Sequence, residues 1–178
     1  MSRSVEGFLK PEEILKQLDL KEDMIAADFG SGSGGWALPL AQILKEGKVY
    51  AIDILEEPLS ALKSRAAILK IFNIAVMRSD IETKNGSGLK DNHLDLVLIT
   101  NLLFEAEDKK EVLAEGKRVL KKGGKILVVD WKKDATLGPK QGRVSAQEVK
   151  EIAVGLDFKL EKELEAGSYH YGLVFTKP

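Results

Sequence analysis

An acidic residue just before a run of glycines is the feature of this sequence most able to do chemistry. Asp28 follows an apolar stretch, and Gly30, Gly32, Gly34 and Gly35 come directly after it. Glycines let the backbone turn sharply, so that a ligand can lie against bare main chain where a helix starts. The pattern predicts a nucleotide or nucleoside site at a strand–turn–helix junction.

Two ligands suit this glycine spacing. Gly30, Gly32 and Gly35 match the dinucleotide pattern G-x-G-x-x-G, whereas Gly30, Gly32 and Gly34 match the shorter G-x-G-x-G of methyltransferases that use S-adenosylmethionine. Asp28 separates the two, because a pyrophosphate beside a carboxylate is costly, while the ammonium and sulfonium of S-adenosylmethionine are attracted to it. We therefore expect S-adenosylmethionine as the cofactor. The residues expected to hold its methionine end are Asp28, Gly30, Ser31, Gly32 and Gly34. An NAD(P)-binding oxidoreductase and a non-catalytic S-adenosylmethionine or nucleotide-binding module stay as alternatives.

A second acid, Asp53, ends the next apolar stretch, Lys48–Asp53. A carboxylate there can accept hydrogen bonds from both ribose hydroxyls of an adenine nucleoside, although NAD would need the same residue. The alternative is an Asp that only initiates a turn. Ile54 follows and either presses on one adenine face or belongs to the core.

Hydrophobic patterning predicts the elements that carry these residues. Alternating strands and helices followed by two alternating strands predict an α/β fold. We expect a doubly wound, mostly parallel seven-stranded sheet with helices on both faces and a C-terminal antiparallel hairpin, a Rossmann-like methyltransferase fold. We expect residues 1–178 to form a single domain, with an N-terminal tail and helix in residues 1–22. The predicted strands are Met24–Ala27, Lys48–Asp53, Ile74–Arg78, Leu94–Thr100, Lys125–Trp131, Phe158–Glu165 and Tyr169–Thr176. The predicted helices are Leu9–Leu18, 34 or 35 to 47, Pro58–Phe72, Asp108–Leu120 and Ser145–Val154.

Composition bounds the class of protein. The chain has 178 residues, of which 44% are hydrophobic and 31% charged, with a net charge of −1 and no cysteine. The absence of cysteine excludes disulfides, thiolate zinc sites and a cysteine nucleophile, and no metal site is predicted. The near-zero charge gives no global attraction to nucleic acid or to an anionic membrane, and no apolar run is long enough for membrane insertion. A cytoplasmic enzyme or binding domain is expected.

The glycine motif, the acid after the next strand and the terminal hairpin together resemble the class I S-adenosylmethionine-dependent methyltransferases. The chain is similar to their small single-domain members of the ubiquinone/menaquinone-biosynthesis group, from about Phe8 to Lys177. Leu120 to Gly124 resembles the family's Leu-Lys-Pro-Gly-Gly turn, with Lys122 in place of proline.

The resemblance implies roles for residues after the third and fourth strands. Asp80 would accept a hydrogen bond from the adenine amine, and the backbone amide of Ile81 would meet a ring nitrogen; the alternative is an Asp that caps a turn. Asn101 lies either in the cofactor pocket or serves only as a strand cap. Many relatives carry a histidine at the position that Phe104 occupies in this sequence. Its replacement by phenylalanine argues against a histidine-assisted mechanism from this loop.

Two other residues are candidates for catalysis at the acceptor side of the sheet. Asp130 lies at the end of the fifth strand, followed by Trp131, which we expect to be a pocket wall. His170 lies near the hairpin turn, where an imidazole of near-neutral pKa would take a proton from an acceptor. The alternative for His170 is a packing or surface role.

The methyl acceptor is not identified by the sequence. The segment from Lys117 to Arg143 contains nine Lys or Arg but only two acids. This excess of positive charge would steer an anionic substrate such as RNA. A solvated lysine-rich surface is the favoured explanation, because neither a pattern of interleaved aromatic residues nor a known RNA-binding module accompanies these cations. A small molecule is preferred over a macromolecule. The short N-terminal segment predicts an open cleft, or one completed by a second subunit in a homodimer.

Overall fold

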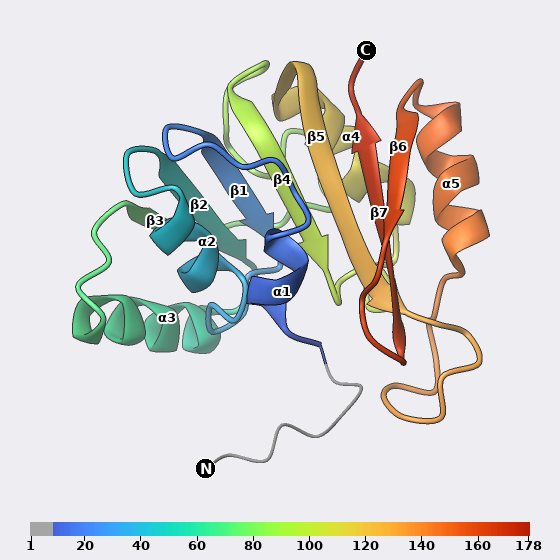
Figure 1. Ribbon diagram of the computed structural model, residues 1–178, viewed down its shortest axis with the longest axis horizontal. Coiled ribbons are helices and arrows are strands. Elements are labelled where there is room, and N and C mark those ends of the chain that lie inside the picture. Colours follow the sequence, from blue (N-terminus) through green and yellow to red (C-terminus); the bar gives the residue numbers. More distant parts are fainter. Residues whose placement is uncertain (1–8) are drawn as a thin grey trace.

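Seven strands of the computed structural model, which describes residues 9–178, form a single sheet (Figure 1). In chain order the strands are β1 (Ile25–Phe29), β2 (Lys48–Asp53), β3 (Ile74–Arg78), β4 (Leu94–Thr100), β5 (Leu120–Trp131), β6 (Lys159–Leu164) and β7 (His170–Thr176). Their spatial order is β3-β2-β1-β4-β5-β7-β6. The first five strands pair in parallel, whereas β7 runs antiparallel between β5 and β6. The predicted fold class, with its terminal hairpin, is confirmed.

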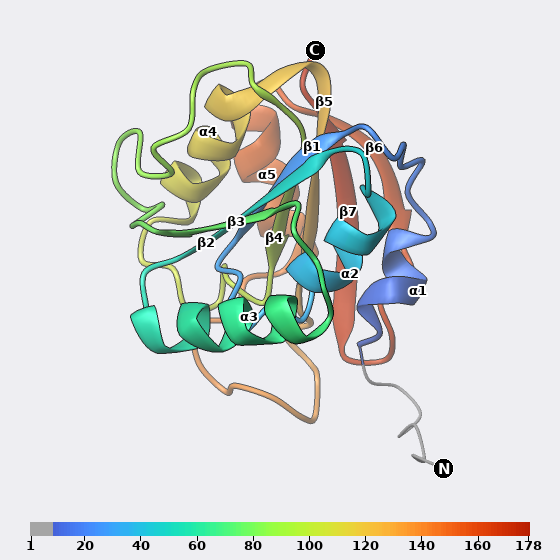
Figure 2. The ribbon, with the colours of Figure 1, turned by 90° about the vertical axis from the view of Figure 1, so that its left-hand side faces the viewer.

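Five helices cover the two faces of this sheet. They are α1 (Pro11–Leu15), α2 (Ala37–Ile43), α3 (Glu56–Ile68), α4 (Lys109–Val119) and α5 (Ala146–Gly155). Figure 2 shows α4 and α5 on one side of the strands and α1 and α2 on the other. Leu62 and Ala66 of α3 belong to the same core as α2, so α3 covers the α2 face. The helices of both faces are needed because a central parallel strand such as β4 is apolar on both sides.

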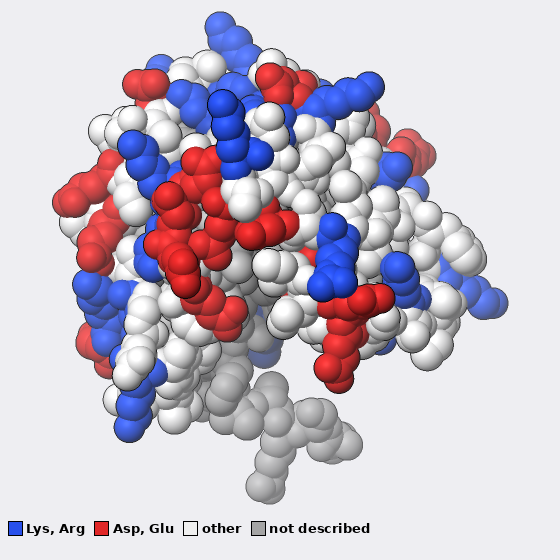
Figure 3. Space-filling view, turned by 180° about the vertical axis from the view of Figure 1, so that it is seen from behind, with Lys and Arg blue, Asp and Glu red and all other residues white. Residues whose placement is uncertain are grey.

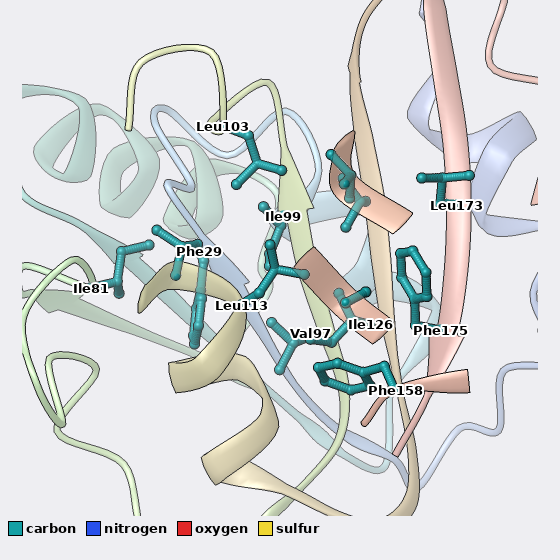
Figure 4. Close-up of a cluster of buried hydrophobic side chains, with 14 of the residues drawn as sticks. Phe29, Ile81, Val97, Ile99, Leu103, Leu113, Ile126, Phe158, Leu173 and Phe175 are labelled. Carbon is teal, nitrogen blue, oxygen red and sulfur yellow. The ribbon is translucent and has the colours of Figure 1, made fainter. Parts of the chain in front are cut away.

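The larger of the two cores lies between the sheet and helices α4 and α5 (Figure 4). Phe29 of β1 and Val97 and Ile99 of β4 point into it, together with Leu113 of α4, and all four are fully buried. The neighbouring residues Leu96 and Leu98 of β4 point into the other core. This alternation explains the nearly continuous apolar sequence of β4.

The described element boundaries differ from prediction in several places. α1 and α2 are shorter than predicted, and α2 begins only at Ala37 because the glycine turn continues to residue 36. α3 begins at Glu56, which places Pro58 inside its first turn. β5 begins at Leu120, which pairs with Leu94 before the register shifts. The capping box at Ser145 and Glu148 is confirmed. The predicted tail, residues 1–8, lies outside the described residues.

Parallel pairing brings the carboxyl ends of β3, β2, β1, β4 and β5 to one edge of the sheet, the lower edge in Figure 1. The antiparallel β7 begins at the same edge, because His170 is paired with Trp131. Residues that follow four different strands, together with the start of β7, are therefore placed side by side. This edge is where a ligand binds in open α/β sheets.

Candidate functional site

A cleft of about 960 Å³, counted out to its open mouth, lies at the carboxyl edge of the sheet. The segments that follow β1, β2, β3 and β4 all contribute to its lining. Seven of the residues predicted for cofactor binding line it: Gly30, Gly32, Asp53, Ile54, Asp80, Ile81 and Asn101. Three others, Asp28, Ser31 and Gly34, do not belong to the lining.

The glycine turn forms the cleft wall beside β1 and β2. The amides of Gly30 and Ser31 both donate to the carbonyl of Ile52, at 2.8 and 2.9 Å, and so pin the turn against β2. Gly32 has a φ of +51°, and the position that a Cβ would occupy has no atom within 4 Å. The backbone conformation, rather than crowding, therefore calls for glycine here, and bare main chain faces the cleft.

Gly34 has a different role from the one predicted. Its φ is +93°, and a Cβ would come within 2.9 Å of Leu62 and 3.0 Å of Leu38. The absence of a side chain at Gly34 therefore lets α2 and α3 approach each other. The spacing of the glycines alone cannot distinguish this packing role from contact with a ligand.

Asp53 is held by backbone amides at both oxygens. Oδ2 accepts from the amide of Gly32 at 2.8 Å, and Oδ1 accepts from the amide of Leu55 at 3.0 Å. These bonds fix the carboxylate, and each oxygen retains a further lone pair for a ligand hydroxyl. Ile54, beside it, is 53% exposed at the cleft, so the core alternative for Ile54 was wrong.

Asp28 is a buried carboxyl with no hydrogen-bond partner at either oxygen. It is 1% exposed, on β1 one residue before the strand ends. Burial, reinforced by the negative charge of Asp53, raises the pKa of Asp28 to about 8, although the nearby amide of Ala37, which does not reach hydrogen-bond geometry with either oxygen, opposes this rise. The hydroxyl of Ser31 is also buried without a partner. Polar groups of this kind are costly unless something binds them, so the pair is a candidate position for a polar group of a ligand.

The Asp80 segment combines a turn with a cleft wall. Oδ1 of Asp80 accepts from the amide of Glu82 at 3.0 Å, and the Thr83 hydroxyl donates to the Asp80 carbonyl at 2.8 Å. The turn-capping alternative is therefore present in the structure, but the carboxylate still lines the cleft. Ile81 is 7% exposed and also packs in the larger core.

Two further acids of the cleft, Glu82 and Glu105, were missed by sequence reasoning. Oε2 of Glu82 accepts the amides of Glu107 and Asp108 at 2.7 and 2.9 Å, just before α4. No motif marks either residue, because only the meeting of the segments after β3 and β4 places them together. The lining thus contains four carboxylic acids, and none of its described residues is Lys or Arg.

Asn101 satisfies both of its predicted interpretations in part. Its amide donates to the Val129 carbonyl at 2.8 Å, as expected of a residue that holds a strand end. Its backbone adopts a positive φ of 49°, and its side-chain Oδ1 is buried without a partner at the cleft.

Asp130, a predicted catalytic candidate, is turned toward backbone groups. Its Oδ2 accepts from the amide of Leu103 at 2.9 Å and its Oδ1 from the amide of Trp131 at 2.8 Å. It is fully buried, and burial raises its pKa to about 6, although these amides oppose the shift. Asp130 therefore holds the loop after β4, and it is not among the residues that line the cleft.

His170 is buried beside Trp131, with 4.0 Å between the ring centroids. Both ring nitrogens lack a hydrogen-bond partner. Burial, together with the charge of Lys132, lowers the pKa of His170 to about 4. The expectation of a near-neutral pKa was wrong, because it ignored the desolvation of this position.

The cations of the loop between β5 and α5 are mostly engaged within the protein. The Arg143 guanidinium donates to the carbonyls of five loop residues: Lys132, Lys133, Ala135, Leu137 and Pro139. Lys133 pairs with Glu148 at 2.7 Å. On the face seen in Figure 3, Lys and Arg are scattered among acidic and uncharged residues, and acidic side chains gather near its middle. These observations favour the solvated surface over a nucleic-acid site.

The remainder of the described chain offers no second site of the same character. A hollow of about 590 Å³ at the opposite edge, near Leu18 and Lys122, has no unpartnered buried polar atom. Within residues 9–178, no group of three or more His, Asp or Glu is placed to hold a metal ion. In the same range no helix has the length and apolarity needed to cross a bilayer.

Comparison with known proteins finds one family. A family model described as a methyltransferase domain matches residues 20–166. The demethylmenaquinone methyltransferase of Bacillus mycoides is 30% identical over 138 residues, which are 75% of this chain and 55% of that protein; the Bacillus cereus protein is 29% identical. The chain thus spans about half the length of the curated relatives it matches.

Solved structures agree on the fold. A SAM-dependent methyltransferase from Aquifex aeolicus superimposes with a TM-score of 0.87 at 29% identity, covering 96% of this chain and 91% of that one. The [4+2]-cyclase SpnF superimposes with a TM-score of 0.83 at 13% identity, covering 98% and 87%. The second shows the fold alone, and it shows that the same fold carries more than one kind of reaction.

Proposed function

Because the chain belongs to the methyltransferase domain family, we propose that it is an S-adenosylmethionine-dependent methyltransferase acting on a small molecule. The observation that carries the proposal is the charge of the cleft. Four carboxylic acids line it, no described lining residue is a cation, and the unpartnered carboxyl of Asp28 is buried beside the glycine turn. A pyrophosphate would meet repulsion here, whereas an ammonium or a sulfonium would be attracted. The residues present therefore fit a cationic nucleoside without phosphate.

The binding roles follow the order of the strands along the edge. Asp53, fixed by two amides, would accept the ribose hydroxyls. Asp80 and the backbone of Ile81 would meet the adenine, and Ile54 would cover one of its faces.

The methionine end would lie at the glycine turn. Asp28 and Ser31 supply buried oxygens that have no partner within the protein, and the main chain of Gly32 lies bare beside them, whereas that of Gly30 is packed against Leu102. Asn101 would complete this end with its free Oδ1. We infer no direct contact for Gly34.

The bound cofactor would supply an activated methyl group, so the protein needs little covalent chemistry of its own. Its residues would need chiefly to hold the reacting atoms in line and to exclude water. Asp130 keeps the loop after β4 in place by accepting a hydrogen bond from the amide of Leu103. His170, neutral at pH 7, is not suited to hold a proton through the reaction, and it does not line the cleft.

The small-molecule acceptor is supported by the relatives, which are demethylmenaquinone methyltransferases, and by the engaged cations of the loop after β5. We propose that residues 1–178 act as one domain, since all seven strands share one sheet. A cytoplasmic location is part of the proposal and is supported by the composition, which has no cysteine for disulfides.

Calorimetric titration with S-adenosylhomocysteine, with NAD⁺ as the matched control, tests the cofactor. We expect binding of S-adenosylhomocysteine alone, and tighter binding of NAD⁺ would refute the proposal. Transfer of radiolabelled methyl groups into the small-molecule, protein and RNA fractions of a lysate tests the reaction. We expect label in the small-molecule fraction; label only in protein or RNA would refute the acceptor class, and no label in any fraction would favour a binding module.

A further inference from the structure

The geometry points to a two-fold symmetric homodimer formed through the outer edge of β3 and the neighbouring side of α3. This surface is separate from the proposed reaction and does not depend on it. It combines an unpaired strand edge, exposed apolar side chains and charges whose order along α3 suits a second copy of the chain.

β3 is the last strand of the sheet and pairs only with β2 among the described strands. The amide of Val49 donates to the Asn73 carbonyl, and the amide of Ser79 donates to the Asp53 carbonyl. Every second residue of a strand directs its backbone N–H and C=O toward the same neighbouring strand, so the backbone groups of residues 73, 75, 77 and 79 face β2. The backbone groups of Ile74 and Val76 therefore point to the open edge, where they are free to pair with another strand.

Large apolar side chains surround this edge. Phe72 is 86% exposed and Ile68 is 79% exposed. A hollow of about 600 Å³ between α3 and β3 is lined by Ala67, Phe72, Ile74 and Val76, with Lys63 at its side. Figure 2 looks onto this edge and shows β3 above α3 with no helix in front of it. A long apolar patch beside an open edge is a liability for a monomer, and burial in an interface removes it.

A second copy fits the edge in an antiparallel register. If Ile74 lies opposite Ile74 of the second copy, Phe72 lies opposite its Val76. Ile74 and Val76 have the same parity, so their side chains lie on one face of β3, the α3 side. Phe72, just before the strand, lines the same hollow, so cross-strand pairs can make contact there. Each copy would place its Phe72 against the hollow of the other. The same patch is used twice, as a two-fold interface requires.

The charges of α3 support the same arrangement. Glu56 and Glu57 lie in its first turn, where Glu56 also pairs with Arg78 of the same chain at 3.1 Å. Lys63 and Lys70 lie in its second half and just after it. A two-fold axis at the β3 edge makes the two α3 helices antiparallel, so the acidic end of each faces the basic part of the other. A parallel, head-to-tail contact would instead bring like charges together, and it would not close.

Sedimentation equilibrium of the full chain between 1 and 100 μM tests the inference. We expect a dimer whose dissociation constant rises at least tenfold in Phe72→Asp and in Val76→Pro, which removes the outward-facing amide of Val76. Val154→Asp on α5, where Val154 is 64% exposed, is the matched control and should leave the dimer intact. Near-UV circular dichroism would confirm that each variant is folded.

The charge order gives a second test that a folding defect cannot imitate. Glu57→Lys and Lys63→Glu should each weaken the dimer, and the double variant should regain most of the loss. A monomer at 100 μM, a dimer insensitive to Phe72→Asp and Val76→Pro, or a dimer broken by Val154→Asp would each overturn the interface. A double variant weaker than both single variants would overturn the antiparallel arrangement.

Discussion

Replacement of Asp28 by asparagine should change the way in which both stability and cofactor affinity depend on pH. In the folded protein the pKa of Asp28 is raised from its ordinary 3.8 to about 8, first by burial and then by the charge of Asp53. Between these two pH values the folded state keeps a proton that the unfolded chain has lost. The free energy of unfolding therefore falls as the pH rises through this window, by ~1.4 kcal/mol per pH unit.

The window from pH 3.8 to about 8 corresponds to about 6 kcal/mol in total. A side-chain amide cannot ionise, so the Asp28→Asn variant should gain stability relative to the natural protein by up to this amount as the pH rises. Urea unfolding of both proteins at pH 5, 6, 7 and 8 measures the difference. A difference that is constant across these pH values would refute the reasoning about burial.

The affinity for the cofactor should rise with pH, opposite to the free energy of unfolding. A ligand cation favours the ionised form of Asp28, so binding below pH 8 should release a proton, and affinity should rise by up to tenfold per pH unit from pH 6 to 8. Calorimetry of S-adenosylhomocysteine binding in buffers of different ionisation enthalpy measures the number of protons released on binding. We expect about one proton released at pH 7 by the natural protein and none by Asp28→Asn. Affinity that is independent of pH in the natural protein would contradict the role of Asp28.

Three other substitutions have expected outcomes. Asp53→Ala should weaken S-adenosylhomocysteine binding at least tenfold, measured by calorimetry, because it removes the fixed carboxylate of the cleft; unchanged affinity would exclude Asp53 from the ribose site. Arg143→Ala should lower the free energy of unfolding by about 3 kcal/mol and expose the loop after β5 to protease, because five carbonyls lose their donor; an equally protected loop would argue against this. His170→Phe should preserve stability, since neither ring nitrogen has a partner, and should leave methyl transfer and cofactor affinity unchanged, because the buried imidazole does not line the cleft. Because the pKa of His170 is about 4, the methyl-transfer rate of the natural enzyme should show no inflection near pH 6.5 that arises from His170. The pH profile of His170→Phe should therefore match that of the natural enzyme near this pH.

The strands that carry the cleft were predictable because their signals are local. Lys48–Asp53, Ile74–Arg78 and Leu94–Thr100 have the predicted bounds, each ending at a polar residue or turn. Helix ends were less predictable, because tertiary contacts decide how far a turn extends. α2 begins at Ala37, after the glycine turn has been pinned to the carbonyl of Ile52, which lies on a different strand.

The sequence alone determined the class of fold, the place of the glycine turn and the acid at the end of each of two strands. These features depend on periodicity, on backbone conformation and on neighbours a few residues away. The tertiary structure decided which polar groups are buried and what surrounds them. It turned Asp130 toward backbone amides, lowered the pKa of His170, and brought Glu82 and Glu105 to one cleft. Desolvation and the meeting of distant segments depend on the whole packed molecule, so no stretch of sequence contains them.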